Sequence, residues 1–208
     1  MFAGKRTVPA PHGQLEAIYR PSSESAERVA LVLHPHPLYG GTMHNPVVFH
    51  CARSLHEAGY ETLRFNFRGV GESTGEFDHG RGEVDDARAA LDFLLEHQPA
   101  ARDVVVAGFS FGAGVALRFG CEDVRVNRLV AIGTPALMVD PAALSSCAKP
   151  KLFLHGDRDD VAPLAALRPL LETRAAQPWD LRVVAGADHF FSVGFEEMRA
   201  TIRSFVAG

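Results

Sequence analysis

The chain has 208 residues, of which 47% are hydrophobic and 22% are charged, and its formal net charge is −4. This balance is typical of a globular protein, and the length predicts a single domain over residues 1–208. Composition and charge exclude a disordered chain, a collagen-like repeat and a small disulfide scaffold, and they argue against a nucleic acid as the main partner.

Two short strands are predicted near the start of the chain, over residues 4–8 and 14–19. Pro11-His12-Gly13 is a turn signal between them, so we expect the two strands to form a hairpin. The polar, serine-rich residues 21–27 predict a loop. Val29-Ala-Leu-Val-Leu33 is a continuous apolar run, which is typical of a strand buried on both faces of a parallel sheet.

The first helix is expected to begin after Asn45, a good N-cap, with Pro46 in the first helical position. Apolar residues then recur at helical spacing until Gly59 supplies a stop. Strands are predicted further on at 60–65, 103–108, 126–132, 151–155 and 181–185, and helices at 83–97, 111–120, 164–174 and 195–206. This alternation predicts an α/β protein with a mostly parallel sheet and helices on both faces.

A candidate nucleophile lies in Gly108-Phe109-Ser110-Phe111-Gly112, a G-x-S-x-G pattern. The pattern is weak alone, but here it ends a predicted strand and opens a predicted helix, the setting that holds such a serine above a sheet. The backbone N–H of Phe111, at the helix N-terminus, is expected to point at a developing oxyanion. We therefore favour Ser110 as a nucleophile over a serine in a glycine turn without chemistry.

A serine hydroxyl needs a base to remove its proton, and the base needs an acid to orient it. Of the ten histidines, His189 stands out because it follows the last predicted strand, and sites form outside the carboxyl ends of parallel strands. The alternative is a capping or core histidine. The acid should follow an earlier strand, and after 151–155 the chain offers Asp157, Asp159 and Asp160. The pattern does not choose among these three, which are also typical of turns.

Four stretches of the chain together resemble the α/β-hydrolase superfamily. They are the HPHPLYGG sequence from His34, the RFNFRGVGES sequence from Arg64, the serine elbow, and His155-Gly-x-x-Asp with Asp188-His189 behind it. In combination they are most similar to small bacterial hydrolases without a cap domain, of the dienelactone-hydrolase-like or esterase-like kind. The resemblance implies an α/β-hydrolase fold and assigns the acid to Asp159, with Asp160 as second choice.

The first stretch departs from the family. Related sequences often carry His-Gly at the oxyanion loop, whereas this chain has His34-Pro35, and proline has no N–H to donate. In the family, the second oxyanion donor lies two positions after the histidine of this loop. The resemblance therefore assigns this donor to the backbone N–H of His36. Leu38 is the next candidate.

The sequence thus predicts a serine hydrolase that cleaves a carboxylic ester or related small acyl substrate with Ser110, Asp159 and His189, and without a cofactor. A thioesterase or peptidase with the same triad is one alternative, although peptidases of this superfamily usually add a second domain. A non-catalytic binding or signalling protein on the same fold is the other. The stretch 133–147, where larger relatives insert a lid, is short and predicts an uncapped serine.

A metal site is a weaker hypothesis, suggested by His34, His36, His44 and His50. These residues lack the spacing of a catalytic zinc site and have no carboxylate among them, so we expect no metal. Arg64 and Arg68 suit a substrate carboxylate, but paired structural arginines are the more usual interpretation.

The three cysteines, at positions 51, 121 and 147, are odd in number and form no C-x-x-C pair, so we expect free thiols. No apolar stretch of signal-peptide length follows Met1, and no run approaches the roughly 18 apolar residues of a membrane span. The sequence therefore predicts a cytoplasmic protein with no membrane partner, and it leaves the oligomeric state open.

Overall fold

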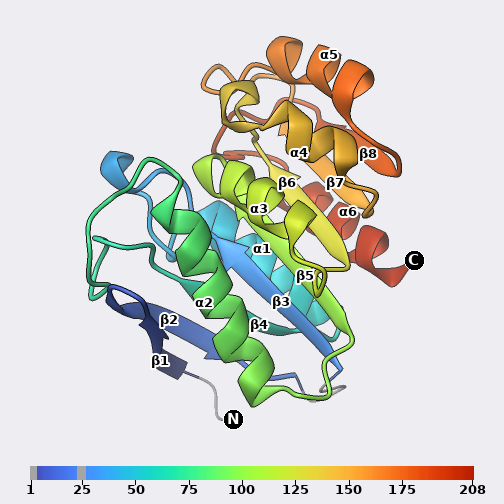
Figure 1. Ribbon diagram of the computed structural model, residues 1–208. Helices are drawn as coiled ribbons and strands as arrows, with labels where there is room; N and C mark the ends of the chain where they lie inside the picture. The colour runs from blue at the N-terminus through green and yellow to red at the C-terminus, as the bar shows by residue number, and fades with distance from the viewer. Residues whose placement is uncertain (1–3, 23–26) are drawn as a thin grey trace.

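The computed structural model describes residues 4–22 and 27–208 (Figure 1). Residues 23–26 of the predicted loop lie outside this part. One sheet has the strand order β1-β2-β4-β3-β5-β6-β7-β8. Its strands are β1 (Gly4–Ala10), β2 (Gly13–Arg20), β3 (Arg28–Leu33), β4 (Glu61–Phe65), β5 (Asp103–Phe109), β6 (Arg128–Ile132), β7 (Lys151–Gly156) and β8 (Trp179–Val184). The pairs β1–β2 and β2–β4 are antiparallel, and the remaining pairs are parallel.

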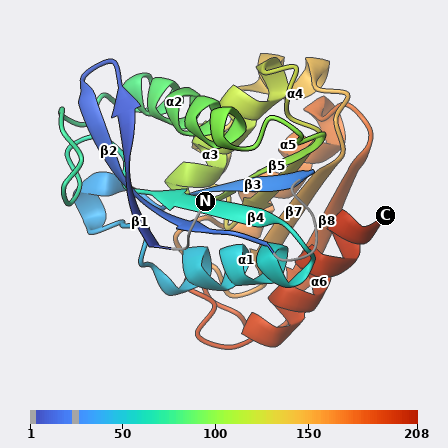
Figure 2. The ribbon, with the colours of Figure 1, turned by 90° about the horizontal axis from the view of Figure 1, so that it is seen from below.

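Helices cover both faces of the sheet, as Figure 2 shows: α1 and α6 lie on one side, and α2, α3, α4 and α5 on the other. Their bounds are α1 (Pro46–Glu57), α2 (Gly82–His97), α3 (Phe111–Glu122), α4 (Pro141–Ser146), α5 (Leu164–Arg174) and α6 (Phe195–Ala207). Two short 3₁₀ turns, η1 (Pro37–Tyr39) and η2 (Ala136–Met138), lie in the loops after β3 and β6. The predicted mostly parallel sheet, its two helical layers and the N-terminal hairpin are therefore confirmed.

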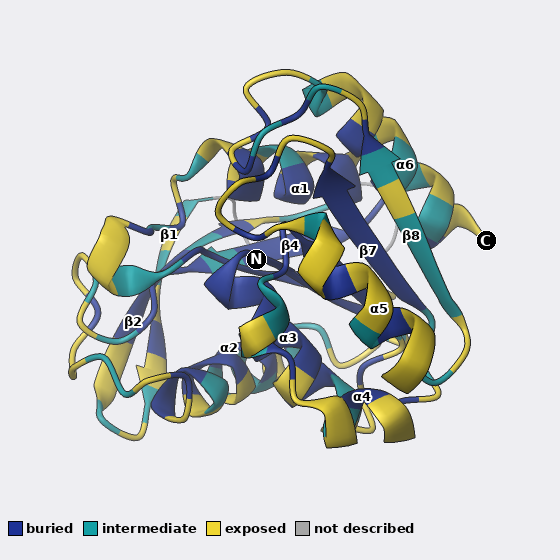
Figure 3. Ribbon diagram, turned by 90° about the horizontal axis from the view of Figure 1, so that it is seen from above, coloured by how far each residue is buried: buried dark blue, intermediate teal, exposed yellow. Residues whose placement is uncertain are grey.

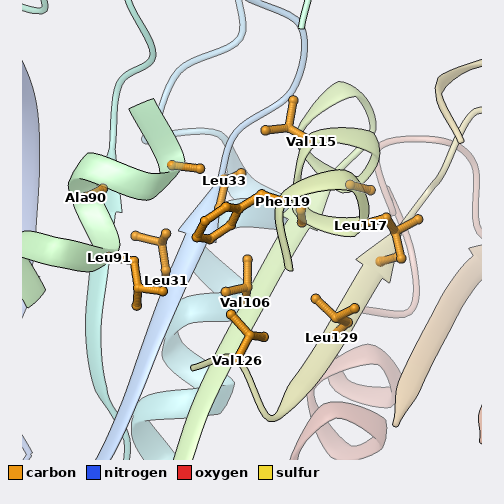
Figure 4. Close-up of a cluster of buried hydrophobic side chains, with 14 of the residues drawn as sticks. Leu31, Leu33, Ala90, Leu91, Val106, Val115, Leu117, Phe119, Val126 and Leu129 are labelled. Atoms are coloured by element: carbon orange, nitrogen blue, oxygen red, sulfur yellow. The ribbon is translucent and has the colours of Figure 1, made fainter. Parts of the chain in front are cut away.

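The central strands have continuous apolar runs because each strand contributes side chains to two hydrophobic cores, one on either face of the sheet. Along β5, Val104 and Val106 pack under α2 and α3, whereas Val105 and Ala107 pack against α1 and α6. Figure 4 shows Phe119 of α3 in the first of these cores. Figure 3 shows β7 buried, with the outer faces of α4 and α5 largely exposed. A strand covered on both sides has no face left for polar residues, which explains the runs.

The segment between β6 and β7 differs from the sequence prediction because it contains the short helix α4. The sequence does carry a signal for this helix, but the signal is confined to the two residues at its start. The Asp140 side chain accepts hydrogen bonds from the N–H groups of Ala142 and Ala143, and Pro141 occupies the first helical position. A helix of six residues has too few apolar positions to show a period. Within the described residues, no helix has the length and apolarity needed to cross a membrane.

A buried ion pair fixes the loop that follows β4. The carboxylate of Asp86 in α2 accepts from the Arg68 guanidinium at 2.7 to 3.1 Å and from the Arg68 backbone N–H at 2.9 Å. His12, in the hairpin turn, places its Nε2 2.8 Å from the same carboxylate. The Asp86 side chain is fully buried, so one carboxylate joins the hairpin, the β4–α2 loop and α2. The Arg68 guanidinium is therefore engaged in a structural ion pair with Asp86.

Replacing Asp86 with alanine is expected to lower the free energy of unfolding by about 3–5 kcal/mol, because the largely buried Arg68 guanidinium loses its counter-charge. Asp85→Ala is the matched control, since it removes an exposed pair with Arg88 on the same helix and should change stability by about 1 kcal/mol or less. Urea unfolding followed by circular dichroism measures both. Equal losses in the two variants would contradict the role given to Asp86.

Candidate active site

Ser110 occupies a strained turn between β5 and α3. Its backbone has φ 56° and ψ −118°, a left-handed conformation that residues with a side chain seldom adopt, and its N–H donates to Ile132 O at 2.8 Å. The glycines on either side make the turn feasible. A Cβ at Gly108 would lie 2.1 Å from Gly112 O, and one at Gly112 would lie 2.5 Å from His34 O. The hydroxyl is therefore fixed at the carboxyl edge of the sheet.

The structure brings Ser110, His189 and Asp159 together from three separate loops. Ser110 Oγ lies 3.0 Å from His189 Nε2, and His189 Nδ1 lies 2.8 Å from Asp159 Oδ2. All three side chains are at least nine-tenths buried. Asp157 instead accepts from the Gly186 N–H at 2.6 Å, and Asp160 is exposed. Of the three candidate aspartates, only Asp159 contacts the histidine.

The surroundings of Asp159 favour its ionised form. Burial alone would raise the pKa of this carboxyl group, but hydrogen bonds from His189 and from the Ala162 N–H outweigh burial and hold the pKa below its ordinary value. Oδ1 accepts from the N–H groups of Val161 and Ala162 at 3.1 and 2.7 Å, which leaves Oδ2 for His189. A carboxylate on Nδ1 keeps that proton in place and directs the lone pair of Nε2 toward Ser110.

The loop after β3 brings the side chain of His36 beside that of Phe111. The rings of His36 and Phe111 have centroids 4.9 Å apart, and neither backbone N–H donates a hydrogen bond within the described part of the chain. Leu38, the other candidate, already donates its N–H to His36 Nδ1 at 3.2 Å. The N–H groups of His36 and Phe111 therefore remain the candidates for the oxyanion donors that the sequence predicts.

His34 anchors this loop to the loop after β4. Its Nδ1 lies 2.6 Å from Pro35 O, and its Nε2 accepts from the Phe67 N–H at 2.9 Å. One nitrogen must donate and the other must accept, so the ring is neutral with its proton on Nδ1. Burial lowers the pKa of His34 to about 4, in agreement with a neutral ring. His34 therefore has a structural part in holding the loop that carries His36.

Sequence reasoning assigned no part in the site to His155, which the structure places beside Asp159. Its Nε2 lies 2.5 Å from Ala162 O and 3.4 Å from Asp159 Oδ2, and the side chain is fully buried. Burial lowers its pKa, which favours the neutral ring. His155 is the first residue of the His-Gly-x-x-Asp motif, so the signal was a histidine near the end of a buried strand.

The histidines considered for a metal have other surroundings. His34 is engaged by backbone groups, and His50 stacks on Phe195 with ring centroids 4.2 Å apart. Within the described ranges, no group of three or more His, Cys, Asp or Glu side chains is placed to hold a metal ion.

Arg64, which was considered for a substrate carboxylate, has structural contacts. Its guanidinium donates to Met43 O at 3.0 Å and lies over the Phe49 ring.

Comparisons with known proteins identify the family of the chain. The family model described as serine aminopeptidase, S33, matches residues 27–149, which contain the Ser110 turn. A protein of Rickettsia prowazekii (strain Madrid E), the uncharacterized protein RP471, is 38% identical over 203 residues, which cover 94% of this chain and 85% of that protein.

Two solved structures are similar over nearly the whole chain. An α/β serine hydrolase homologue from Coxiella burnetii is 35% identical with a TM-score of 0.91, and the match covers 98% of this chain and 97% of that one. XC6422 from Xanthomonas campestris, described as an α/β serine hydrolase without lid, is 35% identical with a TM-score of 0.88, covering 99% and 94%. In this chain the described residues between β6 and β7, where a lid was not expected, form only η2 and α4.

The buried His34 makes stability depend on pH in a defined window. The folded protein keeps the ring neutral down to about pH 4, whereas the unfolded chain binds a proton near pH 6.5. The unfolded state is therefore stabilised relative to the folded state as the pH falls from 6.5 to about 4, and the free energy of unfolding falls by about 3 kcal/mol in total. His34→Gln, whose amide cannot titrate, is expected to show a shallower fall in stability over this window. Urea unfolding at a series of pH values measures the difference, and parallel curves would contradict it.

Proposed function

Because the chain belongs to the serine aminopeptidase S33 family and is an α/β-hydrolase enzyme, we propose that it cleaves a carboxylic ester, or a related small acyl substrate, through an acyl-enzyme on Ser110. The observation that carries the proposal is the continuous chain of contacts from Ser110 Oγ through His189 to Asp159. A serine, a neutral imidazole and an ionised carboxylate in this order form the arrangement that nucleophilic acyl transfer requires.

In the first step, Ser110 Oγ attacks the carbonyl carbon of the substrate while His189 Nε2 takes the hydroxyl proton. The new imidazolium is stabilised by Asp159, whose pKa hydrogen bonds from His189 and the Ala162 N–H hold down and whose position the Val161 and Ala162 N–H groups fix. His189 then gives its proton to the departing alcohol, and the acyl group stays on Ser110. In the second step, water loses a proton to His189 and attacks the acyl carbon. The bond between Ser110 Oγ and the acyl group then breaks, Oγ takes the proton back from His189, and the carboxylic acid leaves.

Negative charge develops on the former carbonyl oxygen in both steps. The N–H groups of His36 and Phe111 are the donors that meet this charge, and the N-terminus of α3 adds a favourable dipole. Donors fixed before the reaction need no reorganisation when the charge forms, which is why backbone groups in a rigid turn are effective. No cofactor takes part in this sequence of steps.

The rim of the site favours an apolar acyl group. Large apolar side chains that are more than half exposed lie on the loops following β3, β6, β7 and β8: Leu38, Tyr39, Leu137, Val161 and Phe190. Phe190 also packs on the His189 ring, with centroids 5.3 Å apart. Of these side chains Phe190 is the one that contacts a member of the triad, so we expect a small apolar acyl group to pack against it.

Ser110→Ala is expected to lower kcat/KM for p-nitrophenyl butyrate by about 10⁴-fold or more, because the nucleophile is lost while the fold is kept. Ser145→Ala, on the exposed side of α4, is the matched control and should keep wild-type activity. An aminoacyl p-nitroanilide and a butyryl thioester assayed alongside separate the peptidase and thioesterase alternatives. Ester hydrolysis that survives Ser110→Ala would refute the mechanism.

Asp159→Asn is expected to reduce kcat by about 10⁴-fold, since the amide no longer holds the His189 tautomer or stabilises its cation. Asp160→Asn, one residue away and exposed, should leave kcat within a factor of about three, as surface substitutions generally do. Steady-state kinetics with the same ester compare the two variants. A larger loss in Asp160→Asn would show that the acid has been misassigned.

A further inference from the structure

The sheet ends at β8, whose outer edge pairs with no other strand in the described part of the chain. In the strand order β8 is the last strand, and it pairs only with β7, in parallel. Only Val184 of its six residues is buried, whereas every residue of β7 is buried. Figure 3 shows β8 along the border of the sheet beside the buried β7. An open edge of this kind is a template for pairing with another strand.

The hydrogen bonds at the two ends of β8 show which of its residues face β7. Pro178 O accepts from the Lys151 N–H at 3.2 Å, and Val184 O accepts from the Asp157 N–H at 3.3 Å. The even-numbered residues from 178 to 184 therefore direct their backbone groups to β7. Because these groups alternate in direction along a strand, the backbone groups of the odd-numbered residues point to the open edge.

Most of the outward backbone groups have no partner among the described residues. The Trp179 N–H donates to Gln177 Oε1 at 3.0 Å. The N–H groups of Leu181 and Val183 donate to no turn, loop or side chain in residues 4–22 and 27–208, and no second strand of the sheet meets them. These two donors, together with the carbonyl oxygens of the three odd-numbered residues, are available to a partner strand.

The side chains of β8 are self-complementary about Leu181. In an antiparallel pair of two copies centred on this residue, each Asp180 faces the partner's Arg182. Each Trp179 likewise faces the partner's Val183, and aromatic and β-branched side chains in opposite positions stabilise a sheet. Asp180 and Arg182 are about half exposed, at 46% and 63%, and their side chains form a hydrogen bond of 2.8 Å within the strand. Two copies therefore form a group of four charges that alternate in sign.

The charges also select one register. Opposite residues of an antiparallel pair must direct their backbone groups alike, so the pairing can shift only in steps of two residues. A shift in one direction places the two Asp180 side chains opposite each other, and a shift in the other direction does so for the two Arg182 side chains. Like charges in opposite positions are destabilising. Charges usually protect an edge strand from pairing, but here they permit one register and oppose its neighbours.

The other edge of the sheet, β1, lacks these properties. It contains Lys5 and Arg6 but no acidic residue, and Pro9 has no N–H to donate. Two copies of β1 would bring only positive charges together, and charged residues and proline are the usual protection of an edge strand. Of the two edges, β8 is therefore the one suited to a second copy of the chain.

We propose that β8 is the interface of a homodimer, in which two copies of this strand pair antiparallel about a twofold axis at Leu181. The open backbone groups and the self-complementary charges of β8 carry the proposal, which is independent of the reaction at Ser110. The pair has two hydrogen bonds between the Leu181 residues and two from the Val183 N–H groups to the partner's Trp179 O. An interface of this small extent is expected to dissociate on dilution.

Sedimentation velocity of the full chain over a range of concentrations measures the association. The wild type should form a dimer whose fraction grows with concentration. Asp180→Arg and Arg182→Asp each place like charges opposite each other in a homodimer, so each should raise the dimer Kd by about tenfold or more. Arg118→Asp, which reverses an exposed charge on α3, is the matched control and should associate like the wild type.

A mixture of the two charge variants tests the register itself. In a mixed pair, one copy carries two positive side chains at positions 180 and 182 and the other carries two negative ones, so opposite charges face each other again. An equimolar mixture of Asp180→Arg and Arg182→Asp should therefore form a heterodimer, although each variant alone is largely monomeric. A mixture that associates no better than the separate variants overturns the proposal.

Val183→Pro tests the backbone contacts. It removes an N–H at the open edge and none that is directed to β7, so it should weaken the dimer while the far-ultraviolet circular dichroism stays that of the folded chain. The charge variants keep the test decisive if this variant does not fold. A dimer that persists unchanged in both charge variants overturns the proposal. So does a wild type that is monomeric at every concentration, which would point to an extended segment of another protein as the occupant of the edge.

Discussion

The site depends first on one backbone constraint, the left-handed conformation of Ser110 between β5 and α3. Gly108 and Gly112 allow the turn because α3 and the end of β3 approach so closely that a Cβ would meet a carbonyl oxygen on either side. Strain of about 1–3 kcal/mol at such a residue persists only where the surrounding structure over-determines it. Here the parallel sheet and the two helical layers supply that support, so fold stability is used to hold one hydroxyl outside the strand ends.

The loops around Ser110 are held in place because their polar groups form hydrogen bonds with specific partners. His34 fastens the loop after β3 to that after β4, Asp86 fastens the latter to α2, and backbone N–H groups hold Asp159. The N–H groups of His36 and Phe111 donate no hydrogen bond within the described residues, which agrees with the proposal that they bind the oxyanion. Preorganised donors in a largely buried setting are the main electrostatic means by which enzymes of this kind lower a barrier.

The sequence predicted the alternating elements and both ends of the Ser110–His189 contact, because apolar runs and glycine turns are local signals. It did not choose among Asp157, Asp159 and Asp160, which share one turn, and only the resemblance assigned Asp159. The structure separates them by direction, since Asp157 turns to the Gly186 N–H and Asp159 to His189. His155 and Asp159 lie in one motif, but the motif does not show which groups the histidine contacts. The contacts of Asp86 with His12 and Arg68 join residues from separate elements, so no single window of sequence reveals them.

Ser110 as an activated nucleophile is the central claim, and covalent labelling tests it most directly. A fluorophosphonate probe loses fluoride when an activated serine attacks its phosphorus, and an unactivated serine in a folded protein reacts far more slowly. Incubation of the native chain with the probe, followed by intact-mass and peptide analysis, should find one adduct per chain, on Ser110. A folded chain that stays unlabelled, or that carries the adduct on another residue, would contradict the account and favour a non-catalytic binding protein on this fold.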